Sequence, residues 1–201
     1  DDNIDLNEFE NLVEKNQEKI AGIMITYPGT NGVFQKNIKE ICEAVHDVGG
    51  LVYMDGANMN AQVGITNPAI SGADVCHLNL HKTFCIPHGG GGPGMGPILC
   101  NSKLKDFLPM NELQVSDEKL SDNRVGNITS SQWSSASILS IPYMYISMMG
   151  EEGLRKATQT AILNANYLKA HLNDYYTIKD VNENGLVGHE FIIDTMEFRK
   201  I

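Results

Sequence analysis

Short apolar runs alternate with one-sided helical patterns along the first hundred residues. A continuous apolar run covers residues 21–25, and strands are also predicted at 51–55 and 73–78, which are mostly apolar. Between the first two segments, apolar residues recur at the spacing of one helix face: Ile38, Ile41, Cys42, Val45 and Val48. Short apolar strands that alternate with such helices are typical of β-α-β units, so the pattern predicts an α/β fold with a mostly parallel sheet and flanking helices.

Further elements are predicted on either side of this unit. Asp5 is the predicted N-cap of a first helix, which is expected to bury Phe9, Leu12 and Val13. A strand is predicted at 97–100, a polar surface excursion at 101–128, and a strand of a different layer at 188–194. Helical patterns cover 132–149 and 151–172. The second helix is expected to bury Leu154, Ala157, Ala161, Ile162 and Leu168.

Composition excludes several classes of protein. The 201 residues include 15 Lys and Arg against 25 Asp and Glu, which gives a net charge of −10 and argues against a nucleic-acid partner. The longest apolar stretch, 138–149, is interrupted by polar residues and proline, so no membrane span is expected. No positively charged segment precedes an apolar stretch at the N-terminus, so no signal peptide is expected either. The four cysteines form no CxxC pair, which favours free thiols over a disulfide framework.

Two residues at predicted strand ends suggest chemistry. Asp55 ends the strand at 51–55, and Lys82 follows the strand at 73–78. In an open α/β sheet, ligands bind beyond the carboxyl ends of the strands. A lysine amine that forms a Schiff base, together with a carboxylate that faces a pyridine nitrogen, is the pairing that a pyridoxal phosphate enzyme needs. Taken singly, Lys82 reads as a snorkelling surface lysine and Asp55 as a turn or cap residue.

Other chemistries find less support. Residues 89–94 satisfy G-x-G-x-x-G, but a proline and a predicted strand follow instead of a helix, so a dinucleotide site is not predicted. In an extended segment His77 and His81 would lie roughly 13 Å apart, too far to share one metal ion. No G-x-S-x-G nucleophile elbow is present either.

Three segments, at 27–34, 54–62 and 77–96, closely resemble the glycine dehydrogenase (decarboxylating) family, the P-protein of the glycine cleavage system. The segments at 160–167 and 188–191 resemble the same family. The resemblance implies the large domain of a fold-type I pyridoxal phosphate-dependent transferase, with the start of a smaller C-terminal domain. The expected domains are residues 1–150, part of the large domain, and 151–201, a linking helix with the start of the small domain.

The resemblance also implies an activity and a set of site residues. The family decarboxylates glycine and passes the aminomethyl group to the lipoyl arm of the H-protein, an oxidoreductase reaction. Lys82 matches the lysine that holds pyridoxal 5'-phosphate as a covalent Schiff base, and Asp55 matches the partner of the pyridine nitrogen. Ala57 matches the small residue under the ring. Thr30, Thr83 and His81 match positions around the pocket, and His81 is a candidate proton carrier, as is His88.

The six glycines of 89–96 either clear a path for the lipoyl arm or only permit a tight backbone turn. The intact enzyme is expected to be a homodimer or heterotetramer, cytoplasmic in bacteria and in the mitochondrial matrix in eukaryotes.

Members of the family are much longer, so the chain is expected to be a fragment that lacks the phosphate-binding loop, binds the cofactor weakly and turns over no glycine. The alternatives are another fold-type I enzyme (an aminotransferase, a serine hydroxymethyltransferase-like protein or a cysteine desulfurase) or an inactive fragment that retains only subunit contacts.

Overall fold

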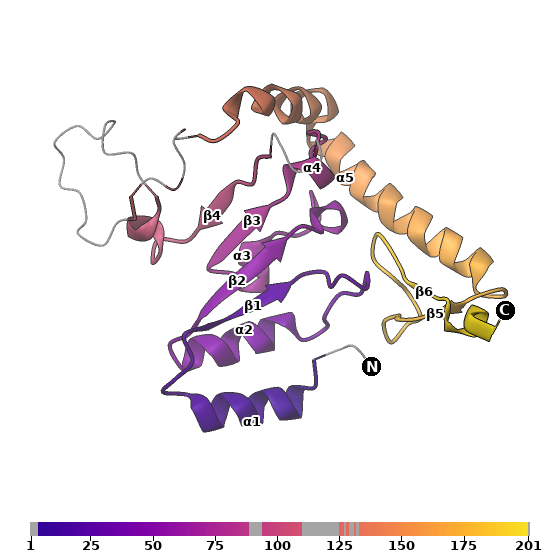
Figure 1. Ribbon diagram of the computed structural model, residues 1–201, viewed down its shortest axis with the longest axis horizontal. Helices are drawn as coiled ribbons and strands as arrows, with labels where there is room; N and C mark the ends of the chain where they lie inside the picture. The colour runs from indigo at the N-terminus through magenta and orange to yellow at the C-terminus, as the bar shows by residue number, and fades with distance from the viewer. Residues whose placement is uncertain are drawn as a thin grey trace.

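The computed structural model describes residues 4–88, 94–109, 125–126, 128, 131 and 133–200 (Figure 1). Its centre is a four-stranded sheet with the order β1-β2-β3-β4. The strands β1 (Gly22–Thr26), β2 (Leu51–Gly56) and β3 (Val75–Leu78) are parallel, and β4 (Ile98–Cys100) is antiparallel to β3. Each predicted strand of this sheet is confirmed to within two residues at its ends.

Two helices lie on one side of the sheet, with α2 (Ile38–Asp47) against the strands and α1 (Leu6–Asn16) outside α2 (Figure 1). The apolar face of α2 buries Ile38, Cys42 and Val45 against Val52 of β2, as predicted. The helix α1 packs on α2, and Asp5 caps it by accepting the backbone N–H of Glu8 at 3.1 Å. The expected burial of Leu12 is wrong, because α1 covers only one helix and Leu12 stays 53% exposed.

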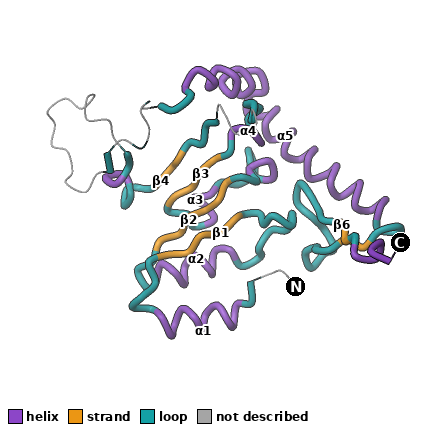
Figure 2. Tube along the Cα trace, in the orientation of Figure 1, coloured by secondary structure: helices purple, strands orange, loops and turns teal. Residues whose placement is uncertain are grey.

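The remaining elements are shorter, apart from one long helix (Figure 2). The α-helices are α3 (Pro68–Ser71), α4 (Leu80–Thr83) and the long α5 (Ser140–Leu172). The 3-10 helices are η1 (Met59–Ala61), η2 (Lys105–Phe107), η4 (Ala136–Leu139) and η5 (Met196–Lys200). The strands β5 (Thr177–Ile178) and β6 (Ile193–Asp194) form a second sheet. The non-helical backbone of Gly150 divides α5 at the predicted junction of two helices, although the first of them begins at Ser140 and not at 132. Most of the predicted excursion at 101–128 lies outside the described residues.

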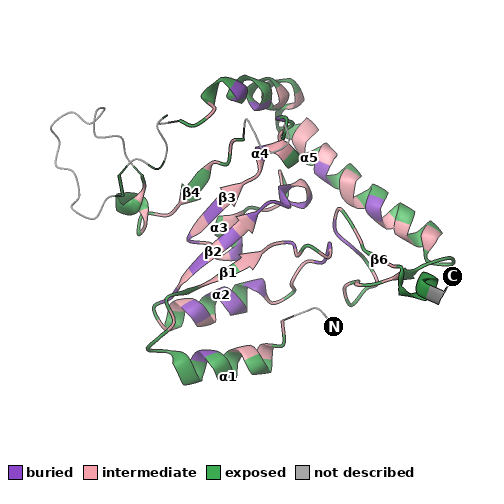
Figure 3. Ribbon diagram, viewed as in Figure 1, coloured by how far each residue is buried: buried purple, intermediate pink, exposed green. Residues whose placement is uncertain are grey.

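The C-terminal part of the chain differs from the sequence prediction in two respects. Only Ile193 and Asp194 of the predicted strand 188–194 form a strand, which pairs with β5. On α5 the buried side chains are Pro142, Thr158 and Ala165, and Leu168 is 52% exposed (Figure 3). Leu154, Ala157, Ala161 and Ile162 of the predicted face are half-buried, so the expected burial is wrong only for Leu168. In the described part of the chain, no helix combines the length and the apolarity needed to cross a membrane.

Candidate functional site

The loops after β1 and β2, the short helix α4 and the long helix α5 lie on the same side of the sheet, at the carboxyl ends of the parallel strands (Figure 1). Asp55 is the last residue but one of β2, and Lys82 lies in α4, directly after β3. The strands pair in parallel with Asp55 opposite His77. The two residues singled out in the sequence therefore follow neighbouring parallel strands, as an α/β ligand site requires.

The Asp55 carboxylate is held in place by its neighbours. Its Oδ1 atom accepts the backbone N–H of Ala57 at 2.8 Å and lies 3.2 Å from Nε2 of His77. The Asp55 side chain is 22% exposed, and Ala57 is 8% exposed. Both contacts are made by Oδ1, and no hydrogen bond from the described part of the chain reaches Oδ2. A partly buried carboxylate with one oxygen fixed and the other open suits an acceptor for a ligand N–H.

Two buried amides, missed in the sequence, join the loops after β1 and β2. Asn58 donates to the carbonyl oxygens of Pro28 at 3.0 Å and Gly29 at 3.3 Å. Gln62 donates to the carbonyl oxygen of Tyr27 at 2.6 Å and is fully buried, while its own Oε1 has no partner. A buried backbone carbonyl group that is not paired within a sheet needs another hydrogen-bond donor, and these two side-chain amides supply one.

Lys82 is exposed and lines a cavity of about 250 Å³ between α4, η1 and α5. The lining residues are Asn60, Val63, Lys82, Thr83, Cys85, Tyr145, Leu154, Ala157, Thr158 and Ala161. Two hydrogen bonds fix α5 beside this cavity: Thr158 donates to the Val63 carbonyl oxygen at 2.8 Å, and Arg155 donates to the Gly64 carbonyl oxygen at 2.9 Å. Asp55 is not among the lining residues, so the cavity does not unite the two predicted residues.

The other predicted site residues occupy different positions around this edge. The hydroxyl of Thr83 donates to Oδ1 of Asn60, which joins α4 to η1. Thr30 is exposed on the loop after β1. The cavity brings Thr83 together with Lys82 but does not include Thr30 or Ala57.

His81 points to a second cavity, of about 240 Å³, which it shares with Asn79, His88 and residues 94–96. The rings of His81 and His88 meet edge to face with their centroids 4.6 Å apart. Burial lowers the pKa of His81, and the charges of His88 and Lys82 lower it further. Neutral at pH 7, His81 can accept a proton, but it lines a different cavity from Lys82. Residues 89–93 of the glycine-rich segment lie outside the described residues.

The segment after α5 reaches the same region, which the sequence did not indicate. Asn166 of α5 donates to the Val187 carbonyl oxygen at 2.7 Å and accepts the Val187 N–H at 3.0 Å. The next residues bring in His189, whose side chain is only 9% exposed and whose Nδ1 has no hydrogen-bond partner. Burial lowers the pKa of His189, nearby Glu190 opposes this, and the charge of Lys82 lowers it further. This histidine therefore belongs to the electrostatic surroundings of Lys82.

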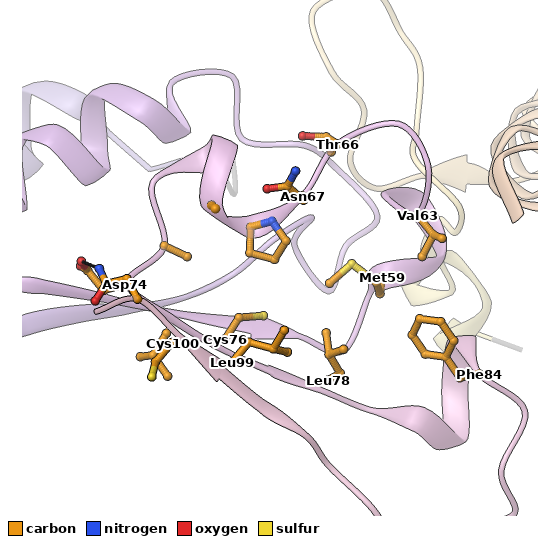
Figure 4. Close-up of a pocket in the computed structure, with 15 residues that line it drawn as sticks. Met59, Val63, Thr66, Asn67, Asp74, Cys76, Leu78, Phe84, Leu99 and Cys100 are labelled. Carbon is orange, nitrogen blue, oxygen red and sulfur yellow. Dashed lines mark hydrogen bonds between the residues drawn. The ribbon is translucent and has the colours of Figure 1, made fainter. Parts of the chain in front are cut away.

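A larger, apolar cavity of about 530 Å³ lies elsewhere, over the face of β3 and β4 (Figure 4). Met59, Cys76, Leu78, Phe84 and Leu99 point into it, with Asp74 at its far end. None of the predicted site residues lines it. In the described ranges, no group of three or more His, Cys, Asp or Glu side chains is arranged to hold a metal ion.

Two protein-family models match the chain. The family model described as "Glycine cleavage system P-protein" matches residues 2–121, and "Glycine dehydrogenase, C-terminal domain" matches residues 157–201. The chain belongs to the glycine cleavage system P-protein family. The resemblance seen in the sequence is confirmed.

Curated P-proteins are similar to almost all of the chain. The sequence is 54% identical over 198 residues to glycine dehydrogenase (decarboxylating) of Nostoc punctiforme, and 55% identical over 199 residues to the human mitochondrial enzyme of that name. Each match covers 98% of this chain, but only 20% of the Nostoc protein and 19% of the human one. The chain thus spans about a fifth of the length of these P-proteins, which occur both in bacteria and in mitochondria.

Solved structures confirm the fold class. The glycine decarboxylase (P-protein) of the glycine cleavage system, in inhibitor-bound form, aligns with a TM-score of 0.58 at 17% identity, covering 85% of this chain and 41% of that one. An alanine–glyoxylate aminotransferase from Nostoc sp. aligns with the same TM-score and identity, covering 92% of this chain and 48% of that one. The predicted α/β fold, a mixed sheet with flanking helices as in these fold-type I enzymes, is therefore confirmed.

Proposed function

We propose that the chain supplies half of a pyridoxal phosphate site, with which the intact P-protein decarboxylates glycine and passes the aminomethyl group to the lipoyl arm of an H-protein. The observation that carries the proposal is the placement of Asp55 and Lys82 at the ends of two neighbouring parallel strands, with one oxygen of Asp55 open. Family membership sets aside the aminotransferase, serine hydroxymethyltransferase-like and desulfurase alternatives.

The residues present fit this cofactor. Lys82 offers an exposed amine for the aldehyde, Asp55 an acceptor for the protonated ring nitrogen, and Ala57 a small buried residue beside it. When bound, pyridoxal phosphate supplies an electron sink that makes loss of carbon dioxide from glycine feasible. The task of Asp55 is to keep a proton on the ring nitrogen by a charge-assisted hydrogen bond. Thr83 and Thr30 are proposed as pocket residues.

His81 is proposed to move protons in the reaction. Its lowered pKa leaves the imidazole neutral near pH 7, which suits a proton acceptor. Residues 1–150 are proposed as part of the large domain, and 151–201 as the linking helix and the start of the small one. The compartment is proposed to follow the source, cytoplasm in bacteria and mitochondrial matrix in eukaryotes, and the intact enzyme to be a homodimer or heterotetramer.

The proposal is tested by trapping the cofactor on the chain. Pyridoxal phosphate is added to the 201-residue chain, borohydride fixes any bound aldehyde, and peptide mass spectrometry locates the label. We expect the label on Lys82, its loss in Lys82→Ala, and its retention in Lys156→Ala, a matched change at an exposed lysine of α5. A label that persists in Lys82→Ala overturns the assignment.

Activity is tested in a full-length relative whose matching segment is replaced by this chain. Asp55→Asn keeps the shape of the side chain but loses its charge, so decarboxylation of glycine is expected to be abolished while the protein stays folded. Turnover close to that of the parent chimera would contradict the role of Asp55.

A further inference from the structure

Asn58 is a buried residue just after β2 that the proposed chemistry does not use. It is 4% exposed and stands at the N-cap of η1, where an asparagine side chain ordinarily accepts a backbone N–H of the helix. Here the side chain makes no such capping bond. Its amide donates instead to the carbonyl oxygens of Pro28 at 3.0 Å and Gly29 at 3.3 Å, on the loop after β1. Helix capping therefore does not account for this side chain.

The loop that receives these two bonds is itself held in place. The backbone N–H of Gly29 donates to the Val33 carbonyl oxygen at 3.0 Å, and the N–H of Gly32 donates to the Gly29 carbonyl oxygen at 2.9 Å. Val33 is only 5% exposed, so the far end of the loop is packed into the core. The amide of Asn58 is thus attached to a loop with its own internal hydrogen bonds.

The backbone next to Asn58 holds the carboxylate of the proposed site. The N–H of Ala57 donates to Oδ1 of Asp55 at 2.8 Å. On the other side of Ala57, Gly56 lies so close to β3 that a Cβ on it would overlap the carbonyl oxygen of His77. The turn after β2 is therefore fixed at Gly56 by β3 and at Asn58 by the loop after β1. With both ends fixed, the direction of the N–H group between them is fixed too.

We propose that Asn58 is a positioning residue for Asp55: its amide anchors the turn after β2 to the loop after β1, which keeps the Ala57 N–H on Oδ1 and leaves Oδ2 free for a ligand N–H. The inference rests on the proposed function only for what the ligand is. Without the Asn58 donors, the buried carbonyl group of Pro28 would lose the side-chain amide that pairs with it. The two loops are then expected to part until water reaches that group, because an unpaired buried carbonyl is costly.

The first test needs no cofactor. In the 201-residue chain, amide hydrogen exchange is followed by NMR at Ala57 and at the amides of β1. Asn58→Leu removes both side-chain N–H groups without adding a charge, and Asn58→Ala does the same with a smaller side chain. In either variant we expect exchange at Ala57 to become about tenfold faster relative to β1, which corresponds to the net contribution of roughly one hydrogen bond.

Asn101→Ala is the matched control for a lost side-chain amide. Asn101 donates to Oδ1 of Asp74 at 2.6 Å, at the other end of the sheet from Asp55. Its loss is expected to lower the free energy of unfolding while exchange at Ala57 relative to β1 stays unchanged.

The second test uses the full-length chimera with bound pyridoxal phosphate. We expect Asn58→Leu to lower kcat about tenfold with little change in KM, because Asp55 is proposed to act on the cofactor ring and not on glycine. The variant should also shift the pH midpoint of the cofactor's absorption, since the carboxylate that faces the ring is no longer held. Asn101→Ala should leave kcat, KM and this midpoint unchanged.

The outcomes distinguish positioning from a merely structural role and from the proposed function. A folded Asn58 variant overturns the proposal if exchange at Ala57 is unchanged, or if kcat and the absorption titration match those of Asn101→Ala. If Lys82 takes no label, the proposed function fails, while exchange at Ala57 still tests the anchoring of the turn. Should neither variant fold, the side-chain N–H groups of wild-type Asn58 decide. Their protection from exchange would support the anchoring, and exchange as fast as that of the exposed Asn7 would overturn it.

Discussion

The backbone N–H of Gly188 donates a hydrogen bond of 2.6 Å to the carbonyl oxygen of Gly32. This bond joins the segment after α5 to the loop after β1, across more than 150 residues of sequence. Asn166 holds the neighbouring Val187 from the other side. The C-terminal segment is therefore clamped between the loop after β1 and α5, and the clamp brings His189 into the surroundings of Lys82.

Gly32→Ala tests this clamp. The backbone of Gly32 has φ +79°, and a Cβ there would overlap the carbonyl oxygen of Glu190. Left-handed backbone costs a residue with a Cβ about 1–2 kcal/mol, and the overlap adds to that cost. Gly49→Ala is the matched control, because Gly49 has φ +81° and open space around its Cβ position. In urea unfolding we expect Gly32→Ala to lose more stability than Gly49→Ala, with faster amide hydrogen exchange at 187–190. Equal losses of stability in the two variants would show that the clamp does not stabilise the fold.

The lowered pKa of His189 predicts a pH dependence of stability. Because burial and Lys82 favour the neutral form in the folded chain, the unfolded chain takes up a proton at a higher pH than the folded chain does. His189 therefore destabilises the fold progressively as the pH falls below its unfolded pKa of about 6.5, despite the opposing charge of Glu190. We expect the free energy of unfolding to decline less steeply from pH 7 to pH 5 in His189→Asn than in wild type. His171→Asn controls for the loss of a histidine, and identical slopes for wild type and His189→Asn would refute the prediction.

Asp74 stabilises the opposite end of the sheet. It is 3% exposed, accepts the Val52 N–H at 2.8 Å and the Asn101 amide at 2.6 Å, and lies 2.7 Å from Nε2 of His46. Burial alone would raise the pKa of Asp74, but the Val52 N–H, His46 and Asn101 together lower it.

Asp74→Asn is expected to lower the free energy of unfolding by about 1–3 kcal/mol at pH 7. The Asn side chain would place N–H donors where the Val52 N–H and the Asn101 amide already donate. The stabilising contribution of the Asp74 carboxylate should be present above the unfolded pKa of Asp, about 3.9, and be lost as the pH falls through the lower pKa of the folded protein. The measurement is urea unfolding at pH 7 and pH 3, with Asp106→Asn, at an exposed position, as the control. A loss that is the same at both pH values would contradict this account.

The sequence predicted the sheet and the two strand ends because both follow from local patterns. Apolar runs mark buried strands, and a residue that follows such a run must lie at the edge of the sheet, so Asp55 and Lys82 could be placed in advance. The roles of these residues could not be read from position alone, since a strand-end Asp or Lys is common. The roles proposed for them rest on the family resemblance.

The rest of the site depends on contacts between distant residues, which no local pattern records. Asn58 and Gln62 read as ordinary loop residues, yet each bonds to carbonyl groups about thirty residues away. His77 was weighed only as a metal ligand, because its partners Tyr53 and Asp55 lie on another strand. His189 lies in the segment 188–194, for which the sequence predicts a strand. Most of this segment is a loop, and side-chain and backbone hydrogen bonds hold it in place instead of the hydrogen-bond ladder of a sheet.

The four cysteines, all free thiols, differ in burial, which predicts two classes of reactivity. Cys42 is 1% exposed and Cys76 is 3% exposed. Burial raises the pKa of each to about 11, with added contributions from Asp74 and Glu43 at Cys42 and from Asp55 at Cys76. At pH 8 about one thiol in a thousand would then be ionised, and the thiolate is the reactive form.

In the folded chain at pH 8, a thiol reagent such as dithionitrobenzoate is therefore expected to modify Cys85, which is exposed, and more slowly Cys100, which is half-buried. Cys42 and Cys76 should react only on the timescale of unfolding. Cys85→Ser should remove the fast phase and leave the slow one unchanged. In denaturant all four thiols should react, because burial no longer opposes ionisation or access. Modification of Cys42 or Cys76 in the folded chain as fast as that of Cys85 would mean that β2, β3 and α2 do not close over them as described.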